Sequence, residues 1–163
     1  MRKALAAFLG LLPFLAGAHT LDAGAFQLKL PAGFTSQPSS DPQQFVLYSK
    51  AEDTYLTLSY LPMNAPAARL PEVARKLLEF RLQGEQAAAA ASGLHLTIAE
   101  PIVVPFSKGQ QVAYFGKDNH GRVFRYLGIV VPQKTINVFA ESPSRSTQDL
   151  EKLFNQVLQG LKF

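Results

Sequence analysis

Apolar and polar residues alternate most regularly between Gln110 and Glu141. The alternation predicts three successive strands, because side chains on a strand point to opposite faces with a period of two. Asp118–Gly121 predicts the first turn, where short polar residues and a glycine tolerate a positive φ, and Pro132 with Gln133 predicts the second. Connections this short require antiparallel pairing.

The middle strand of this meander carries apolar residues on both faces. Phe124, Tyr126 and Val130 fall on one side, and residues such as Val123 and Leu127 fall on the other. An antiparallel sheet that meets water on one face would be polar there. We therefore expect helices above and below the sheet.

Shorter strand patterns precede the meander. They cover residues 26–30, the hairpin 45–49 and 54–60, and two short apolar runs at 94–98 and 102–106. The proline-containing stretches 35–44 and 61–70 have the composition of loops.

Two helices are predicted. The first opens at Pro71 and ends near Ser92–Gly93, since proline suits the first turn and glycine the residue after the end. Its expected buried stripe is Val73, Leu77, Phe80, Ala87 and Ala91. The second follows a capping-box variant at Ser146–Asp149, with an apolar face formed by Leu150, Leu153, Phe154, Val157, Leu158 and Leu161.

These elements predict an α+β fold, an α/β/α sandwich with a central, mainly antiparallel sheet of about six or seven strands and two main helices. We find no internal repeat and no domain boundary in the sequence. The expected organisation is a cleaved signal peptide at residues 1–18 and a single globular domain over residues 19–163.

The signal-peptide prediction depends on the order of residues at the N-terminus. Arg2 and Lys3 precede an apolar run from Ala4 to Leu15, and the small residues Ala16–Ala18 follow it. The run is shorter than the ~20 residues of a membrane span. We expect export to the periplasm of a bacterial envelope, and the absence of cysteine excludes both disulfides and a lipoprotein anchor.

The charge balance gives no support for binding to nucleic acid or to a membrane. The net charge of +4 falls to +2 when Arg2 and Lys3 are removed with the signal peptide. Bulk basicity then gives no support for nucleic-acid binding, and no membrane anchor is expected after cleavage. The sequence does not indicate an oligomeric state.

Candidate chemistry is sparse. The sequence contains no nucleophile elbow, zinc-protease motif, phosphate loop or calcium loop. His19, His95 and His120 stand apart from one another, and the adjacent acids Glu52 and Asp53 are typical of a solvated turn. We expect no catalytic residue, no cofactor, no metal and no enzymatic activity.

The best candidates for recognition of a protein partner are Lys117, Arg122, Arg125 and Tyr126 in the meander, since arginine and tyrosine are enriched in binding hot spots. The alternative is that Tyr126 and Phe124 belong to the core and Arg122 stabilises the hairpin. The two predicted loops, 35–44 and 61–70, are a second candidate surface.

The order of motifs resembles the PsbP-like superfamily. Phe26–Phe34 has the pattern F-x-L-x-L-P-x-G-F, Gly109–Tyr126 has G-x-x-V-x-Y-x-G followed by G-R-x-F-x-Y, and Phe154–Phe163 closes the chain with F-x-x-V-L-x-x-L-K-F. That superfamily includes the photosystem protein PsbP, a Ran-binding import factor and bacterial envelope proteins of the DcrB kind. The resemblance implies an α/β/α sandwich and protein binding rather than catalysis. It carries over no functional residue, and this chain lacks the cysteine of the anchored bacterial members.

Two functional hypotheses follow from the sequence. The first is a periplasmic protein-binding module, acting either in an envelope assembly or as an immunity protein that neutralises a periplasmic toxin. The second is a small-ligand carrier or hydrolase that uses a cleft between a helix and the sheet.

Overall fold

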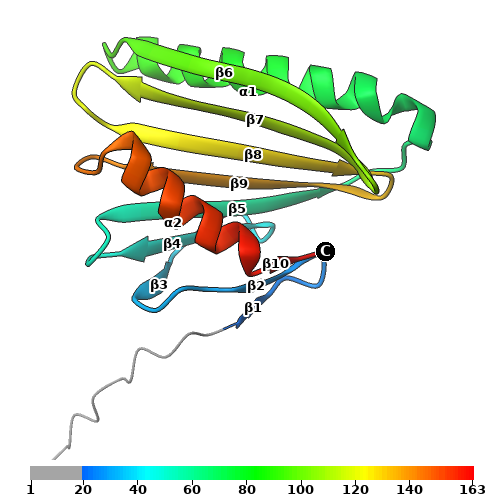
Figure 1. Cartoon of the computed structure of the whole chain (residues 1–163), viewed down its shortest axis with the longest axis horizontal. Coiled ribbons are helices and arrows are strands. Elements are labelled where there is room, and N and C mark those ends of the chain that lie inside the picture. Colours follow the sequence, from blue (N-terminus) through cyan, green and yellow to red (C-terminus); the bar gives the residue numbers. More distant parts are fainter. Residues whose placement is uncertain (1–19) are drawn as a thin grey trace, which may run out of the picture.

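The computed structural model describes residues 20–163, so the predicted signal peptide lies outside the described residues. Seven strands form the main sheet (Figure 1) in the order β3-β4-β5-β9-β8-β7-β6. Their bounds are β3 Phe34–Gln37, β4 Gln44–Ser49, β5 Thr54–Pro62, β6 Leu96–Phe106, β7 Gly109–Asp118, β8 Val123–Val131 and β9 Lys134–Ser142. Every neighbouring pair is antiparallel, so the predicted sheet is confirmed.

The predicted meander forms β7, β8 and β9. Both predicted turns are present, with Gly121 at φ 90° in the first and Pro132–Gln133 in the second. Every residue of β8 is buried except Arg125, which is half-buried. The expectation that this strand is covered on both faces is confirmed.

Two long helices cover opposite faces of the sheet, α1 at Leu70–Ala91 behind it in Figure 1 and α2 at Thr147–Gln159 in front. A single 3₁₀ turn, η1 at Ala67–Arg69, leads into α1. The three helix ends that the sequence marks are found, with α1 starting at Leu70, one residue before Pro71. Gly93 follows α1 with φ 68°, and the Ser146 hydroxyl accepts a 3.1 Å hydrogen bond from the Asp149 N–H at the start of α2.

A small second sheet completes the layer that contains α2. It consists of β1 Thr20–Asp22, β2 Gln27–Lys29 and β10 Leu161–Lys162, in the order β1-β2-β10. Leu28 of β2 is fully buried and belongs to one core cluster with Leu47 of β4, Leu58 of β5 and Phe154 of α2. The small sheet and α2 therefore cover this face of the main sheet together.

Two strand predictions are corrected. The stretch 35–44, predicted as a loop, begins within the edge strand β3, whose backbone pairs with β4 although its residues Thr35–Gln37 are polar. Residues 96–98 of the first predicted run and all of 102–106 belong to one strand, β6, which has a bulge between Ala99 and Ile102. Glu100 adopts a φ of 52° there, so the strand continues past the residues predicted to end it.

The buried stripe predicted for the first helix is also wrong in part. Phe80 is 72% exposed and Ala87 and Ala91 are exposed, whereas Leu70, Ala74 and Ala89 are buried. The buried face of α1 is rotated about the helix axis relative to the predicted one. It includes two charged residues, Arg81 and Glu85, which a search for apolar residues at helical spacing leaves out. The predicted apolar face of α2 is confirmed at Leu150, Leu153, Phe154 and Val157, all of which are buried.

Candidate functional site

The two helices do not cover the whole main sheet. α1 contacts β6, β7 and β8 on one face, and α2 contacts β8 and β9 on the other. The small sheet adds cover to β4 and β5 on the α2 side. Two quarters of the sheet therefore carry no helix: β6 and β7 on the α2 side, and β4 and β5 on the α1 side.

The uncovered quarter on the α2 side is apolar. The register places Ile102 opposite Ala113 and Ala99 opposite Phe115 on neighbouring strands. Val112 and Tyr114 pack under α1, so Ala113 and Phe115, which alternate with them along β7, point to the α2 side. We call the surface formed by Ile102, Val104, Phe106, Ala113, Phe115 and Phe163 the open face.

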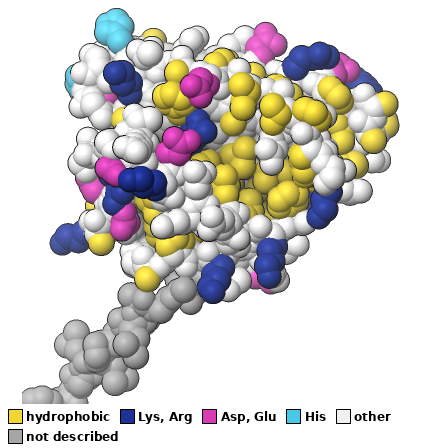
Figure 2. All heavy atoms as spheres, viewed as in Figure 1, with side chains coloured by type: hydrophobic (Ala, Val, Ile, Leu, Met, Phe, Trp, Pro, Cys, Tyr) yellow, Lys and Arg dark blue, Asp and Glu magenta, His cyan; other side chains and the backbone are white. Residues whose placement is uncertain are grey.

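Side chains of the open face are exposed far more than core residues are. Ile102 is 46% exposed, Val104 38% and Phe163 38%. Figure 2 shows hydrophobic side chains gathered over β6, β7 and β8 beside α2, in a shallow depression. One polar side chain, Gln111, lies opposite Val104 on this face, and a largely apolar surface of this kind on a folded domain is typical of an interaction site.

Basic residues frame the open face. Arg125 lies opposite Phe115 in the β7–β8 register, with its guanidinium 5.5 Å from the centre of that ring and 3.5 Å from the Glu151 carboxylate of α2. Lys117 is exposed two residues beyond Phe115 and lines a hollow of about 170 Å³ with Thr147 at the start of α2. At the opposite end, the Lys108 ammonium lies 5.7 Å from the centre of the Phe163 ring.

The structure divides the four residues predicted for recognition between the two faces. Lys117 and Arg125 lie beside the open face, whereas Arg122 and Tyr126 lie on the α1 side. Arg122 donates a 3.0 Å hydrogen bond to Asp118 and pairs with Glu141. Tyr126 is fully buried, and its hydroxyl donates a 2.7 Å hydrogen bond to the Asn137 side chain. These two residues stabilise the core and the hairpin, as the alternative interpretation of the sequence states.

Sequence reasoning missed the apolar residues of the open face. Ile102, Val104 and Phe106 alternate along one strand and share one face, which is the pattern of a strand with a buried side. Nothing in the sequence indicates that the chain leaves this side without cover. That fact depends on where α2 crosses the sheet.

The uncovered quarter on the α1 side is more polar. Thr57 and Ser59 line it, and Tyr48 and Tyr55 pack against each other with ring centres 4.5 Å apart. The Tyr48 hydroxyl donates a 3.3 Å hydrogen bond to Asp53. Tyr55 and Leu61 on this face are exposed, at 42% and 59%, but Thr57 and Ser59 lie between them, so this quarter has a mixed surface rather than the largely apolar one of the open face.

A polar layer lies beneath α1. The Arg81 guanidinium lies 2.9 Å from the Glu85 carboxylate and 4.9 Å above the centre of the Tyr126 ring. Burial raises the pKa of Glu85 above its ordinary value, and the neighbouring Arg81 opposes that rise. The two opposite charges pair inside the packed interface between α1 and the sheet.

The adjacent acids of the β4–β5 turn act in the fold. Glu52 pairs with Arg145, and its backbone carbonyl accepts a second hydrogen bond from that arginine. The Asp53 carbonyl accepts a 2.7 Å hydrogen bond from the Ser142 hydroxyl. Both acids therefore attach the connection between β9 and α2 to the sheet, and neither stands across a cleft from another acid.

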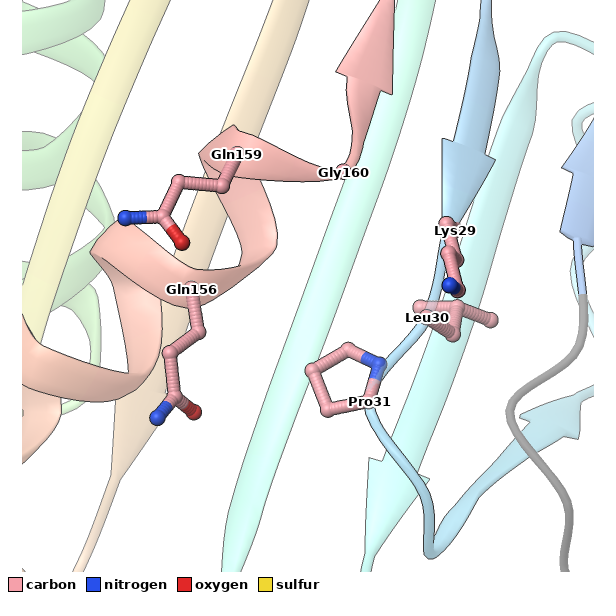
Figure 3. Close-up of a pocket in the computed structure, with 6 residues that line it drawn as sticks. All are labelled: Lys29, Leu30, Pro31, Gln156, Gln159 and Gly160. Carbon is pink, nitrogen blue, oxygen red and sulfur yellow. The ribbon is translucent and has the colours of Figure 1, made fainter.

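The helix–sheet cleft that a carrier or hydrolase would need corresponds to a hollow of about 350 Å³ between α2 and β2. Gln156 and Gln159 of α2 line one side of it, and Lys29 of β2 and Pro31 of the turn after β2 line the other (Figure 3). Its lining holds no carboxylate and no imidazole. Within residues 20–163, no three metal-ligating side chains gather at one place, and neither helix is long and apolar enough to cross a bilayer.

Comparisons with known proteins identify the fold. No protein-family model matches the sequence, and the comparison with curated proteins gives no match. The solution structure of cyanobacterial PsbP (CyanoP) from Synechocystis sp. PCC 6803 matches with a TM-score of 0.63 and 12% identity, over 94% of this chain and 98% of that one. A crystal structure from Bacteroides thetaiotaomicron matches with a TM-score of 0.52 and 10% identity, over 86% of this chain and 45% of that one. The chain has a PsbP-like fold, as the resemblance of its motifs implies.

Proposed function

We propose that the chain is a non-enzymatic protein-binding module of the bacterial envelope, which acts in the periplasm after its signal peptide is removed. The single observation that carries the proposal is the open face, where Ile102, Val104 and Phe163 form an exposed apolar surface beside Lys117 and Arg125. Protein interfaces combine an apolar centre with a polar rim in this way.

A protein partner fits this surface better than a small ligand does. Small-ligand sites enclose most of the ligand, which requires a deep cleft. The open face is a broad, shallow surface; the hollow at its Lys117 end holds about 170 Å³, and the hollow at its Lys108–Phe163 end holds about 320 Å³ and is open to solvent. A partner with a surface of its own can cover such a face, whereas a metabolite would remain largely in water.

Co-purification from the periplasm tests the proposal. The tagged protein is compared with an Ile102→Thr/Val104→Thr variant, which keeps β-branched residues in the strand while replacing apolar groups by hydroxyls. Phe80→Ser is the matched control, since Phe80 is 72% exposed on the outer side of α1. We expect a stoichiometric protein with the wild type and the control, and its loss with the double variant. A bound metabolite without any protein would contradict the proposal.

The identity of that protein separates the two versions of the function. A structural or assembly component of the envelope would place the module in envelope assembly. A secreted toxin whose activity falls on binding would make it an immunity protein.

A further inference from the structure

We infer that the open face binds an amphipathic helix of a partner protein that carries acidic residues near both of its ends. This inference rests on the proposed function and deepens it by specifying the chemistry of the bound segment. Three features of the described residues support it: a blocked strand edge, the arrangement of helices on the sheet, and the charges at the two ends of the face.

The edge of β6 is unsuited to pairing with another strand. A peptide that adds to a sheet edge needs a row of free backbone donors and acceptors. Pro101 and Pro105 lack an N–H, and the bulge with Glu100 at φ 52° interrupts the regular spacing. Prolines and bulges on an edge strand prevent such pairing. A partner therefore lies across the face rather than along the edge.

The face is shaped for a helix. On the opposite side of the same strands, α1 packs its 22 residues against β6, β7 and β8. On the open side α2 covers β8 and β9 and reaches β6 and β7 only at its first residue, Thr147, beside Lys117, so the place between that end and Lys108 carries no helix. A second helix in that place would cover the open face as α1 covers the other side, and helices pack on one another at about 8–10 Å between axes.

The charges indicate which helix fits. Lys108 and Lys117 lie at opposite ends of β7, about 30 Å apart along the strand at ~3.3 Å per residue. A helix of about 20 residues spans that distance at 1.5 Å per residue. The ion pairs found within residues 20–163 include neither lysine. Carboxylates near both ends of the bound helix would meet these two ammonium groups.

The same charges disfavour a second copy of this chain as the occupant. In a two-fold dimer each copy presents the same patch to the other. The lysines at the ends of one open face would approach those of its partner, and Glu151, the acid on the flank of α2, already pairs with Arg125. Like charges brought together across an interface oppose association.

Site-specific photo-crosslinking in whole cells tests the inference. The photoreactive residue p-benzoylphenylalanine is placed at Val104 in the open face, at Tyr55 on the α1 side of the sheet and at Phe80 on the outer side of α1. Mass spectrometry then maps the partner segment that is joined at each position. We expect an adduct from Val104 alone, joined to a segment with apolar residues at helical spacing and carboxylates toward both ends.

Charge reversal provides the second readout. We expect Lys108→Glu/Lys117→Glu to reduce the yield from Val104 at least fivefold. The matched control Lys29→Glu/Lys50→Glu makes the same change in net charge at exposed residues of β2 and the β4–β5 turn, and it should leave the yield unchanged.

The remaining outcomes distinguish failure of the inference from failure of the proposed function. The inference would be overturned by a Val104 adduct with a basic or extended segment, with a second copy of this chain or with a lipid. It would also be overturned if the lysine reversal left the crosslinking yield at Val104 unchanged. Protein adducts from Tyr55 or Phe80 without one from Val104 would overturn it too, while the module would still be a protein binder. The absence of a protein adduct at all three positions would overturn the proposed function itself.

Discussion

Tyr114 and Tyr126 stack beneath α1 with ring centres 4.8 Å apart and an angle of 24° between the rings. Both side chains are fully buried, yet their hydroxyls differ. The Tyr126 hydroxyl donates a 2.7 Å hydrogen bond to Asn137, whose amide in turn donates to Ser59 at 3.2 Å. The Tyr114 hydroxyl lies near Arg81 and Glu85 but makes no hydrogen bond of good geometry with any described residue, and burial raises its pKa to about 12.

This difference predicts opposite effects of the same substitution on two neighbouring residues. Tyr126→Phe should lower the free energy of unfolding by about 1–2 kcal/mol, because Asn137 loses its partner inside the protein. Tyr114→Phe should leave stability unchanged or raise it by up to about 1 kcal/mol, because it removes a buried hydroxyl that has no partner. Urea unfolding of the two variants measures both values. Equal losses would show that the Tyr114 hydroxyl has a partner in solution.

Two glycine-to-alanine substitutions should change the free energy of unfolding in opposite directions. Gly84 lies in the exposed interior of α1, where an added Cβ meets nothing within 4 Å. Gly84→Ala should stabilise the protein by about 0.5–1 kcal/mol, since alanine loses less backbone entropy in a helix. At Gly128 in β8 the Cβ would lie 2.6 Å from the Tyr126 hydroxyl and 3.1 Å from Leu77 of α1. Gly128→Ala should cost about 1–3 kcal/mol in thermal or urea unfolding, and no cost would mean that α1 packs less closely than described.

Stability should fall in acid through Asp118. Burial opposes ionisation of this carboxylate, but hydrogen bonds from the Arg122 side chain and from the His120 and Arg122 N–H groups outweigh it, and its pKa lies below the ordinary 3.8. A carboxylate with a lowered pKa stabilises the fold above its unfolded pKa and loses that contribution as pH falls through the folded value. The loss should therefore occur below about pH 4.

Asp118→Asn checks this assignment. The variant should be about 2 kcal/mol less stable at pH 7, because the hairpin loses charge-assisted hydrogen bonds, and its stability should fall less steeply below pH 4. Urea unfolding across pH 2–7 gives both quantities. Parallel pH profiles of variant and wild type would assign the acid sensitivity to other carboxylates.

Periodicity sufficed for the sheet centre and the second helix, whereas the first helix was located by Pro71 and Gly93 and its buried face was predicted only in part. The meander was predictable because β-branched and aromatic residues such as Val123 and Phe124 form a short apolar run between two turns, which favours a strand buried on both faces. Turn residues with a positive φ, such as Gly121, marked its connections. The second helix was predictable because the cap at Ser146 marks its start and apolar residues at helical spacing follow directly.

The errors arise where long-range contacts override local preference. Polar Thr35 joins a strand because its backbone pairs with Tyr48 of β4. Phe80 points to water because Arg81, the next residue, turns inward over the Tyr126 ring. Two of the predicted recognition residues lie beside the open face and two on the opposite side, since the strand period of two separates Arg125 from Tyr126. The open face itself was not predictable, because it depends on where α2 crosses the sheet.

The affinity of the purified partner for the open-face variant tests the central claim most directly. Isothermal titration calorimetry compares the wild type, Ile102→Thr/Val104→Thr and the Phe80→Ser control, each checked for unchanged stability. Exposed apolar residues at the centre of an interface contribute more than 1 kcal/mol each when they act as hot spots, so we expect at least a tenfold increase in Kd for the double variant and an unchanged Kd for the control. The same Kd for all three proteins would contradict the claim that the open face is the binding surface.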